Sequence, residues 1–344
     1  MFVAKQFREI LDSISTLEMK VDKTHQQFCE VILKWSKKVS ISFLEQKAAL
    51  RLAEVMGATN QFRQAVVHVE NVIKEGRIID DKHTLVEAHL LEATLLFNMK
   101  NIPKAKSALT ACRANSNSIF CTTLLIARIE TVAGMIHIHE NDYKIAFSYF
   151  YEAFEMYHQN KKTQRALENF QYICLCKIMM NNDDEAENLF KGRFGIIYGE
   201  LDFSKVMFKI LMANKDKNLM MLEKILYEHK EDINSREIIS SQIKLLYENL
   251  LEKNILKLTK PYTKVQLSYL SRKLGVGVSR IEKKISEMIL DGKLKGTLDQ
   301  GIGNLILFRE DDLDPMFKSS AQILDNMEMV IGQLFAKTEK LRVK

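Results

Sequence analysis

The sequence contains little proline and glycine, with 3 and 13 residues respectively in a chain of 344. These two residue types interrupt helices, so their scarcity removes most of the breaks that would divide a helical chain. Hydrophobic residues make up 47% of the chain and charged residues 27%, as in globular proteins of one or two domains. The composition therefore predicts a mainly α-helical protein.

Long uncharged apolar segments are also missing. No stretch approaches the roughly 20 apolar residues that span a bilayer, and Glu9 and Asp12 interrupt the region where a secretory signal would have its apolar core. The five cysteines are an odd number without a CxxC pair, which disfavours a disulfide framework and a zinc ribbon. We therefore expect reduced thiols, a location in the cytoplasm and nucleus, and no membrane partner.

Catalytic signatures are missing as well. The sequence contains no GxxxxGK[ST], HExxH or GxSxG motif, and its two GxG segments lack the third glycine of a dinucleotide loop. His137 and His139 form an HxH pair of the kind found in zinc isopeptidases, but Phe147 and Phe150 stand where those enzymes have Ser and Asp. Residues two apart also diverge on a helix, which favours ordinary packing. We predict no enzyme, no cofactor and no metal.

What the sequence does contain is a repeat of about 40 residues. Four segments align on alanines that are 40, 41 and 40 positions apart, namely Ala65, Ala105, Ala146 and Ala186. Mostly apolar residues stand three positions before and four positions after each alanine: Phe62, Ile102, Tyr143 and Asp183 before, and Val69, Leu109, Phe150 and Phe190 after. Such spacings place the side chains on one helix face, and the small residue permits close packing. A polar turn and another helical run precede each segment.

This pattern predicts stacked helical hairpins. The period is longer than the roughly 34 residues of a tetratricopeptide (TPR) unit, but the Asn- and Asp-containing turns are TPR-like. Because one hairpin leaves an apolar face uncovered, the units must stack into a right-handed α-solenoid, which we assign to residues 1–235. A non-repetitive bundle is the alternative, and three near-equal spacings disfavour it. Solenoids offer long surfaces that bind other macromolecules.

A different module is predicted for residues 236–312. A helix over Ser240–Lys257 is followed by a second, VQLSYLSRKLG, capped by Thr263, and a third, RIEKKISEMILDG, capped by Ser279. Two short apolar runs around Asp-Gln-Gly-Ile-Gly then predict a two-stranded hairpin. This order of elements, in which two helices, a turn, a third helix and a two-stranded wing follow one another, predicts a winged-helix fold.

The same region is basic. Residues 253–295 contain eleven Lys or Arg against three acidic residues, a balance of +8. Arg280, Lys283 and Lys284 would lie on the helix that winged-helix proteins place in the major groove. Nucleic-acid binding is therefore an alternative function, but the acidic wing tip at Asp299 and the lack of Asn or Gln on that helix disfavour it. The free strand edges could instead pair with a strand of another chain.

The last segment, residues 313–344, predicts one long helix from Pro315 to Leu341. Its apolar residues Ile323, Met327, Val330 and Leu334 follow helical spacing, with Leu324, Ile331 and Phe335 beside them. A helix of about 27 residues is about 40 Å long. The apolar stripe could fold back on its own winged helix or join a bundle with helices of other subunits.

This order of modules resembles the PCI domain, which is shared by scaffold subunits of the proteasome lid, the COP9 signalosome and translation initiation factor three. Four strings resemble a proteasome lid subunit in particular, and the resemblance covers nearly the whole chain from about Phe43 onward. They are PKAKSALTACRANSNSIFC (Pro103–Cys121), FSYFYEAFEMY (Phe147–Tyr157), CLCKIM (Cys174–Met179) and SEMILDGKLKGTLDQGIGNLILF (Ser286–Phe308). The KPYT string at Lys260–Thr263 is shared with a COP9 signalosome subunit, so that complex is an alternative.

The resemblance implies a non-catalytic scaffold of the 26S proteasome lid in ubiquitin-dependent degradation. In that family the winged helices of neighbouring lid subunits pair edge to edge and their terminal helices form one bundle. The solenoid contacts the ATPase ring and an α-subunit of the core particle, and it starts from an extended helical N-terminus that is shorter in this chain. The implied partner-binding residues lie on the wing strands and the terminal stripe: Leu294, Leu298, Leu305, Ile306, Leu307, Phe308, Ile323, Leu324, Met327, Val330, Ile331 and Leu334.

Overall fold

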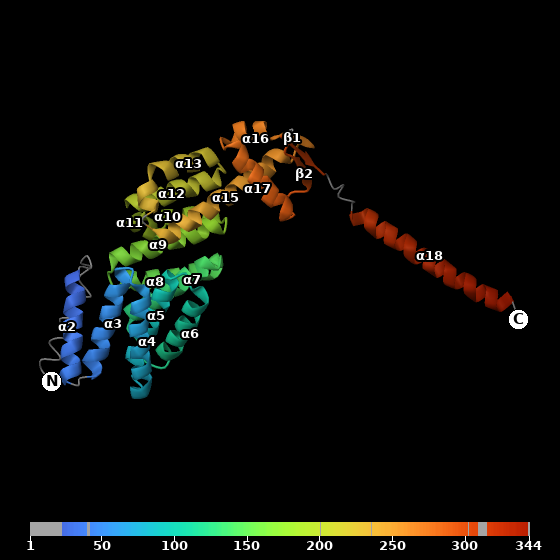
Figure 1. Ribbon diagram of the computed structural model, residues 1–344. Helices are drawn as coiled ribbons and strands as arrows, with labels where there is room; N and C mark the ends of the chain where they lie inside the picture. Colours follow the sequence, from blue (N-terminus) through green and yellow to red (C-terminus); the bar gives the residue numbers. More distant parts are fainter. Residues whose placement is uncertain are drawn as a thin grey trace. The chain divides into compact units, whose positions relative to one another are not determined.

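The computed structural model describes residues 23–39, 42–199, 201–234, 236–301, 303–308 and 315–342. These residues are mainly helical with one small sheet (Figure 1), as the composition predicts. The chain divides into two compact units, Met1–Tyr247 and Glu248–Lys344. The boundaries expected from the sequence, at 235/236 and 312/313, stay predictions.

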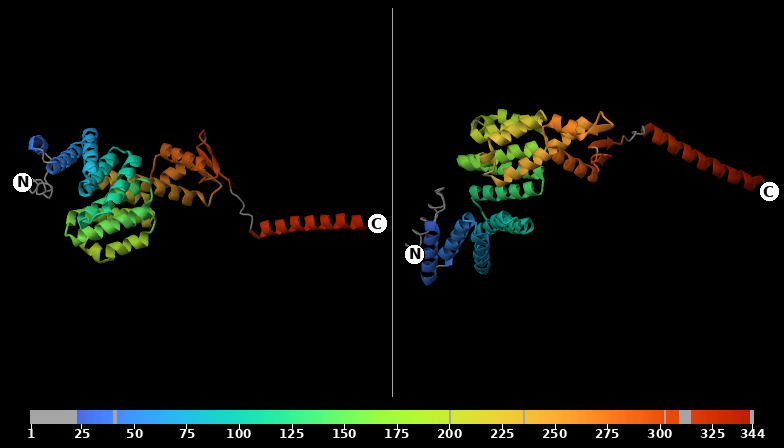
Figure 2. Two further views of the ribbon diagram at one scale, coloured as in Figure 1. Left: turned by 90° about the horizontal axis from the view of Figure 1, so that it is seen from below. Right: turned by 45° about the horizontal axis from the view of Figure 1, so that its top comes forward.

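The first unit is a stack of helices, most of which pack against the next helix along the chain (Figures 1 and 2). Its first half contains α2 (Lys23–Val39), α3 (Ser42–Ala58), α4 (Phe62–Ile79), α5 (Lys82–Asn98), α6 (Ile102–Ser116) and α7 (Thr123–His139). Its second half contains α8 (Tyr143–Gln159), α9 (Thr163–Met179), α10 (Asp183–Lys191), α11 (Arg193–Tyr198), α12 (Asp202–Lys215), α13 (Leu219–Glu228) and α14 (Lys230–Asn234). This is the α-solenoid that the repeat predicts.

The repeat positions fall where the sequence pattern places them. Helices α4, α6, α8 and α10 begin at the residues three positions before the aligned alanines, and all four alanines are fully buried. The turn that precedes each of these helices contains one residue with left-handed backbone: Asn60 (φ 63°), Lys100 (φ 62°), Asn141 (φ 64°) and Asn181 (φ 58°). After this residue the chain reverses, and the next N–H donates to a carbonyl five residues back, as from Gln61 to Met56 at 2.9 Å.

Close helix contacts depend on small residues at the repeat interfaces. Gly134 on α7 faces Phe150 on α8, and a Cβ atom at position 134 would lie 2.6 Å from the Phe150 ring. The ring itself is fully buried. Glycine at this position therefore allows α7 and α8 to pack around a large aromatic side chain.

The second unit contains a winged helix followed by a long terminal helix. Helix α15 (Glu237–Thr259) begins in the first unit and ends in the second. The other elements are β1 (Lys264–Gln266), α16 (Leu267–Leu274), α17 (Val278–Leu290), β2 (Gly296–Asp299), β3 (Asn304–Leu307) and α18 (Pro315–Arg342). The strands form an antiparallel sheet in the order β1-β3-β2.

Two local predictions were wrong in this unit. Lys264–Gln266 is a strand, not the start of a helix, so the sheet has three strands and α16 begins at Leu267. The β-branched side chain of Val265 is buried while its two neighbours are exposed, and pairing with β3 fixes this alternation. Helix α17 begins at Val278 with Gly277 as the N-cap, so Ser279 lies in the first turn and does not cap it.

Candidate docking surfaces

The wing residues expected to bind partners differ in exposure. Leu294 and Leu305 are buried in the second unit, whereas Ile306 and Phe308 are 39% and 58% exposed. Leu298 and Leu307 are partly buried. The exposed pair therefore provides an apolar surface on the wing, while the buried pair supports the winged helix from within.

Among the described residues, no further strand pairs with the outer edges of β1 and β2. Strand β3 pairs with β1 through Lys264↔Ile306 and with β2 through Thr297↔Ile306, so both of its sides are occupied. The expectation that Leu305–Phe308 offers an edge to a neighbour does not fit this order. A three-stranded sheet leaves only its outer strands for pairing with another chain.

Helix α18 carries a continuous apolar surface that we call the terminal ridge. It consists of Ile323, Leu324, Met327, Val330, Ile331 and Leu334, each between 50% and 66% exposed. At 100° per residue these six side chains fall within an arc of about 120°. Met329, which is 59% exposed, points to the opposite side of the helix. The arc is wider than the a/d stripe of a two-helix coiled coil and suits a bundle with more than one neighbour.

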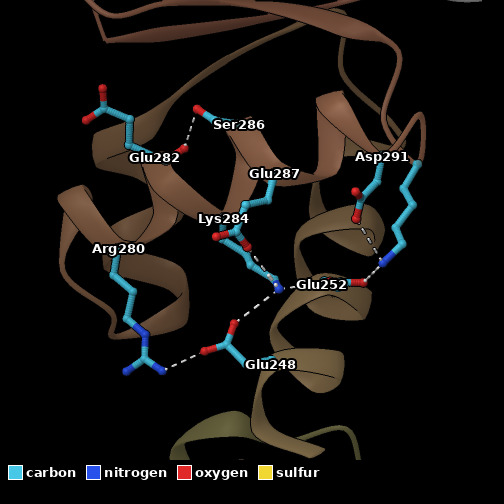
Figure 3. Close-up of polar contacts among 9 residues, drawn as sticks. Glu248, Glu252, Arg280, Glu282, Lys284, Ser286, Glu287 and Asp291 are labelled. Carbon is cyan, nitrogen blue, oxygen red and sulfur yellow. Dashed lines mark hydrogen bonds and ion pairs between the residues drawn. The ribbon is translucent and has the colours of Figure 1, made fainter. Parts of the chain in front are cut away.

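Two of the three α17 cations expected to face a DNA groove, Arg280 and Lys284, are ion-paired within the second unit (Figure 3), whereas Lys283 is exposed. Lys284 Nζ lies 2.9 Å from Glu252 Oε1 and 3.2 Å from Glu248 Oε2. Arg280 Nη2 lies 3.0 Å from Glu248 Oε1, and Lys293 Nζ lies 2.9 Å from Glu252 Oε2. These contacts join α17 and the entry to the wing to α15. They reduce the charge available for phosphate contacts on α17.

The pKa values of the network agree with this pairing. Burial opposes the charge on Lys284, but hydrogen bonds to Glu252 and Glu248 outweigh it and raise the pKa of the ammonium group. Burial likewise opposes the charges on Glu248 and Glu252, yet hydrogen bonds from Arg280, Lys284 and Lys293 lower the pKa of both carboxyls. The network is therefore fully charged at neutral pH.

The HxH histidines do not converge. The His137 ring stacks on Tyr149, whereas the His139 ring lies edge-on to Phe97. Potential ligand atoms of His137, Glu140 and Asp142, one from each residue, lie within 4.8 Å of one another, a grouping that could hold a metal ion.

One carboxylate of that grouping is already paired with the ammonium group of a lysine. Lys106 Nζ lies 2.9 Å from each oxygen of Glu140, so an ammonium group already faces this carboxylate. A divalent ion would have to displace it. The arrangement supports the packing interpretation of His137 and His139.

The five cysteines are unpaired and buried. Burial raises the pKa of the Cys112 and Cys176 thiols to about 12 and also raises that of the Cys174 thiol. At neutral pH these groups are protonated and act as small apolar side chains. Buried, protonated thiols agree with the expectation that the cysteines are reduced.

Comparison with known proteins identifies the family. Residues 226–309 match the PCI domain family, a range that contains the winged helix. A "26S proteasome non-ATPase regulatory subunit 11 homolog" of Arabidopsis thaliana is 32% identical over 338 residues, which cover 98% of this chain and 80% of the relative. The "26S proteasome non-ATPase regulatory subunit 11" of Dictyostelium discoideum is 33% identical over 337 residues, which cover 98% and 81%. The chain belongs to the non-ATPase regulatory subunit 11 family.

Membership of the subunit 11 family confirms the resemblance drawn from the four sequence strings. A probable 26S proteasome regulatory subunit of Schizosaccharomyces pombe is also similar, at 32% identity over 331 residues covering 96% of this chain and 78% of the relative. Helix α18 lies beyond the PCI match, at the C-terminal end of the chain. None of the helices among the described residues has the length and apolar character that crossing a membrane requires.

Proposed function

We propose that the chain is a non-catalytic scaffold subunit of the lid of the 26S proteasome regulatory particle and acts in ubiquitin-dependent degradation. The observation that carries the proposal is the terminal ridge on a chain of the subunit 11 family. Six large apolar side chains on one helix face have a favourable free energy of burial, at roughly 25 cal/mol per Å² of apolar surface removed from water. Helices of other subunits would supply that burial.

In this proposal each module has a separate partner. The terminal ridge enters a helix bundle with other PCI subunits of the lid, and the free edges of the wing sheet, together with Ile306 and Phe308, contact neighbouring winged helices. The solenoid contacts the proteasomal ATPase subunits and an α-subunit of the core particle. The site of action is the cytoplasm and nucleus.

The first test is affinity purification of a tagged full chain followed by mass spectrometry. We expect lid, ATPase and core-particle subunits in stoichiometric amounts. Recovery of COP9 signalosome subunits instead would assign the chain to that alternative complex. Recovery of the chain alone would reject both.

The terminal ridge can be tested with a matched pair of substitutions. Met327→Asp places a carboxylate on the ridge, whereas Met329→Asp places the same group on the opposite side of α18. We expect the first to lower recovery of lid subunits by about tenfold, because a buried charge costs more than 1.4 kcal/mol, and the second to have little effect. Equal recovery from the two variants would contradict a role for the ridge.

Nucleic-acid binding through α17 remains the alternative of a different class, and the structure disfavours it. Arg280 and Lys284 are occupied by Glu248 and Glu252. Binding to phosphates would have to break these ion pairs. Such binding would weaken steeply with added salt, and a weak, unspecific electrophoretic shift at physiological salt would dismiss it.

A further inference from the structure

Charge is segregated along the second unit. Residues 253–281 contain seven Lys or Arg and no Asp or Glu. Glu248 and Glu252 on α15 pair with Arg280 and Lys284 of α17 and with Lys293, which follows α17. One part of the module is therefore neutralised internally, and another part is left basic.

The basic part is exposed. It contains Lys257, Lys260, Lys264, Arg272 and Lys273, all of which are exposed to solvent. Among the residues that the structure describes, none of these five has a carboxylate oxygen within 4.0 Å. Cations that lack an internal partner are available to a partner with negative charge.

Two tyrosines lie among these cations. The rings of Tyr262 and Tyr269 are 6.2 Å apart and nearly perpendicular, at 76°, and Tyr262 is 45% exposed. The Tyr262 side chain shares a hydrogen bond with Tyr269, which raises the pKa of Tyr262, and the positive charge of Lys273 opposes this more weakly. Exposed tyrosine beside lysine is typical of binding surfaces, since the ring supplies contact area and the hydroxyl can donate to a carboxylate.

The backbone of β1 provides a third feature. Leu307 N–H donates to Thr263 O and Leu267 N–H donates to Gly303 O, so residues 263, 265 and 267 direct their backbone groups toward β3. In an antiparallel ladder the intervening residue points the other way. The N–H and C=O of Lys264 therefore lie on the outer edge of β1, where an extended peptide can pair with them.

We propose that these features form one docking surface for an acidic segment of a partner protein that lies along the outer edge of β1. Its carboxylates face Lys260, Lys264 and Lys273, and its backbone pairs with Lys264. A protein segment fits better than a nucleic acid because a strand edge offers backbone pairing that nucleotides cannot use. The inference rests on the proposed function, since the partner is another subunit of the same assembly.

Carbodiimide cross-linking tests this surface in complexes purified through a tagged full chain. The reagent joins a lysine amine to a carboxylate within ion-pair distance. We expect mass spectrometry to find Lys260, Lys264 or Lys273 joined to Asp or Glu of another polypeptide. Complexes that contain proteasome subunits but no such link would overturn the acidic-segment inference alone. Purifications without proteasome subunits would overturn both proposals.

Charge reversal provides a matched comparison. Lys264→Glu should lower the recovery of the cross-linked partner by about fivefold, as for the loss of an interfacial ion pair. Lys283→Glu makes the same change at an exposed position of α17 and should leave recovery unchanged. Similar thermal unfolding of the two variants would show that both are folded, and equal recoveries would then overturn the inference. A nucleic-acid result would also overturn it. If the free chain shifts a single-stranded dT oligonucleotide in an electrophoretic assay and Lys264→Glu abolishes that shift, the surface binds nucleic acid instead.

Discussion

At the scale of single residues, the burial of small side chains decides how closely the repeats pack. Gly134 is buried against the Phe150 ring, which is itself fully buried. Gly134→Ala should therefore lower the free energy of unfolding by about 1–3 kcal/mol through overpacking. Urea denaturation followed by circular dichroism measures this.

A second substitution separates the clash from other effects of alanine. Phe150→Leu shortens the side chain that the new methyl group would meet. The double variant should lose less stability than the sum of the two single variants, because the two changes act on one contact. Strict additivity would show that the ring is not the cause.

The thiols give another prediction at this scale. Burial is the largest cause of the raised pKa of Cys112, Cys174 and Cys176, so the reactive thiolate form is scarce at neutral pH. We expect these cysteines to react slowly with an aromatic disulfide reagent in the native chain and fast in denaturant. Rapid reaction of the native chain at pH 7, located to these cysteines by peptide mapping, would contradict their burial.

At the scale of elements, the ion pairs between α15 and α17 predict a defined pH window. The pKa values of Glu248 and Glu252 are lowered by folding, so their contribution is present above about pH 4.5 and is lost as the pH falls through the folded values. The pKa of Lys284 is raised, so its contribution is present below about pH 10.5 and is lost as the pH rises through the folded value. The network should stabilise the unit most between these limits.

Lys284→Met tests this window. Since the network is partly exposed, we expect a loss of about 1 kcal/mol at pH 7 that shrinks at both acid and strongly alkaline pH. Lys283→Met is the matched control, because the neighbouring lysine is exposed and its loss should change stability little. A difference between the variants that stays constant from pH 3 to pH 7 would show that the effect of Lys284 is not electrostatic.

The elements also show what the sequence could and could not predict. The repeat helices were predictable because their alanines, turns and apolar positions recur at fixed intervals, and α18 was predictable from one long periodic stripe. Strand β1 was not, because three residues are too few to show an alternating pattern, and only its pairing with β3 makes it a strand.

The basic docking surface on and near β1 also shows what local sequence patterns cannot predict. Its net charge was visible in the sequence, but the choice of which cations pair internally depends on Glu248 and Glu252, which lie about 30 to 40 residues away. Local sequence patterns do not contain that information. Among the described residues, the cations on and near β1 that have no carboxylate partner can be recognised only after these pairs are known.

At the scale of the whole molecule, the described side chains of α18 are exposed, so this helix should contribute little to the stability of the rest. Removing residues 315–344 should leave the thermal midpoint of the remaining chain unchanged within about 2 °C, because the described side chains of this segment are not part of a core. Differential scanning calorimetry of the full and shortened chains makes the comparison. A large drop in midpoint would instead indicate that the ridge folds back on its own chain.

The bare terminal ridge also has a consequence for chains that are made in excess. Chaperones and protein quality-control ligases bind exposed apolar helices, so a newly synthesised copy without companions presents the surface by which they select clients. We expect such orphan copies to be cleared quickly. The cellular amount of this subunit would then follow the supply of its neighbours more closely than its own rate of synthesis.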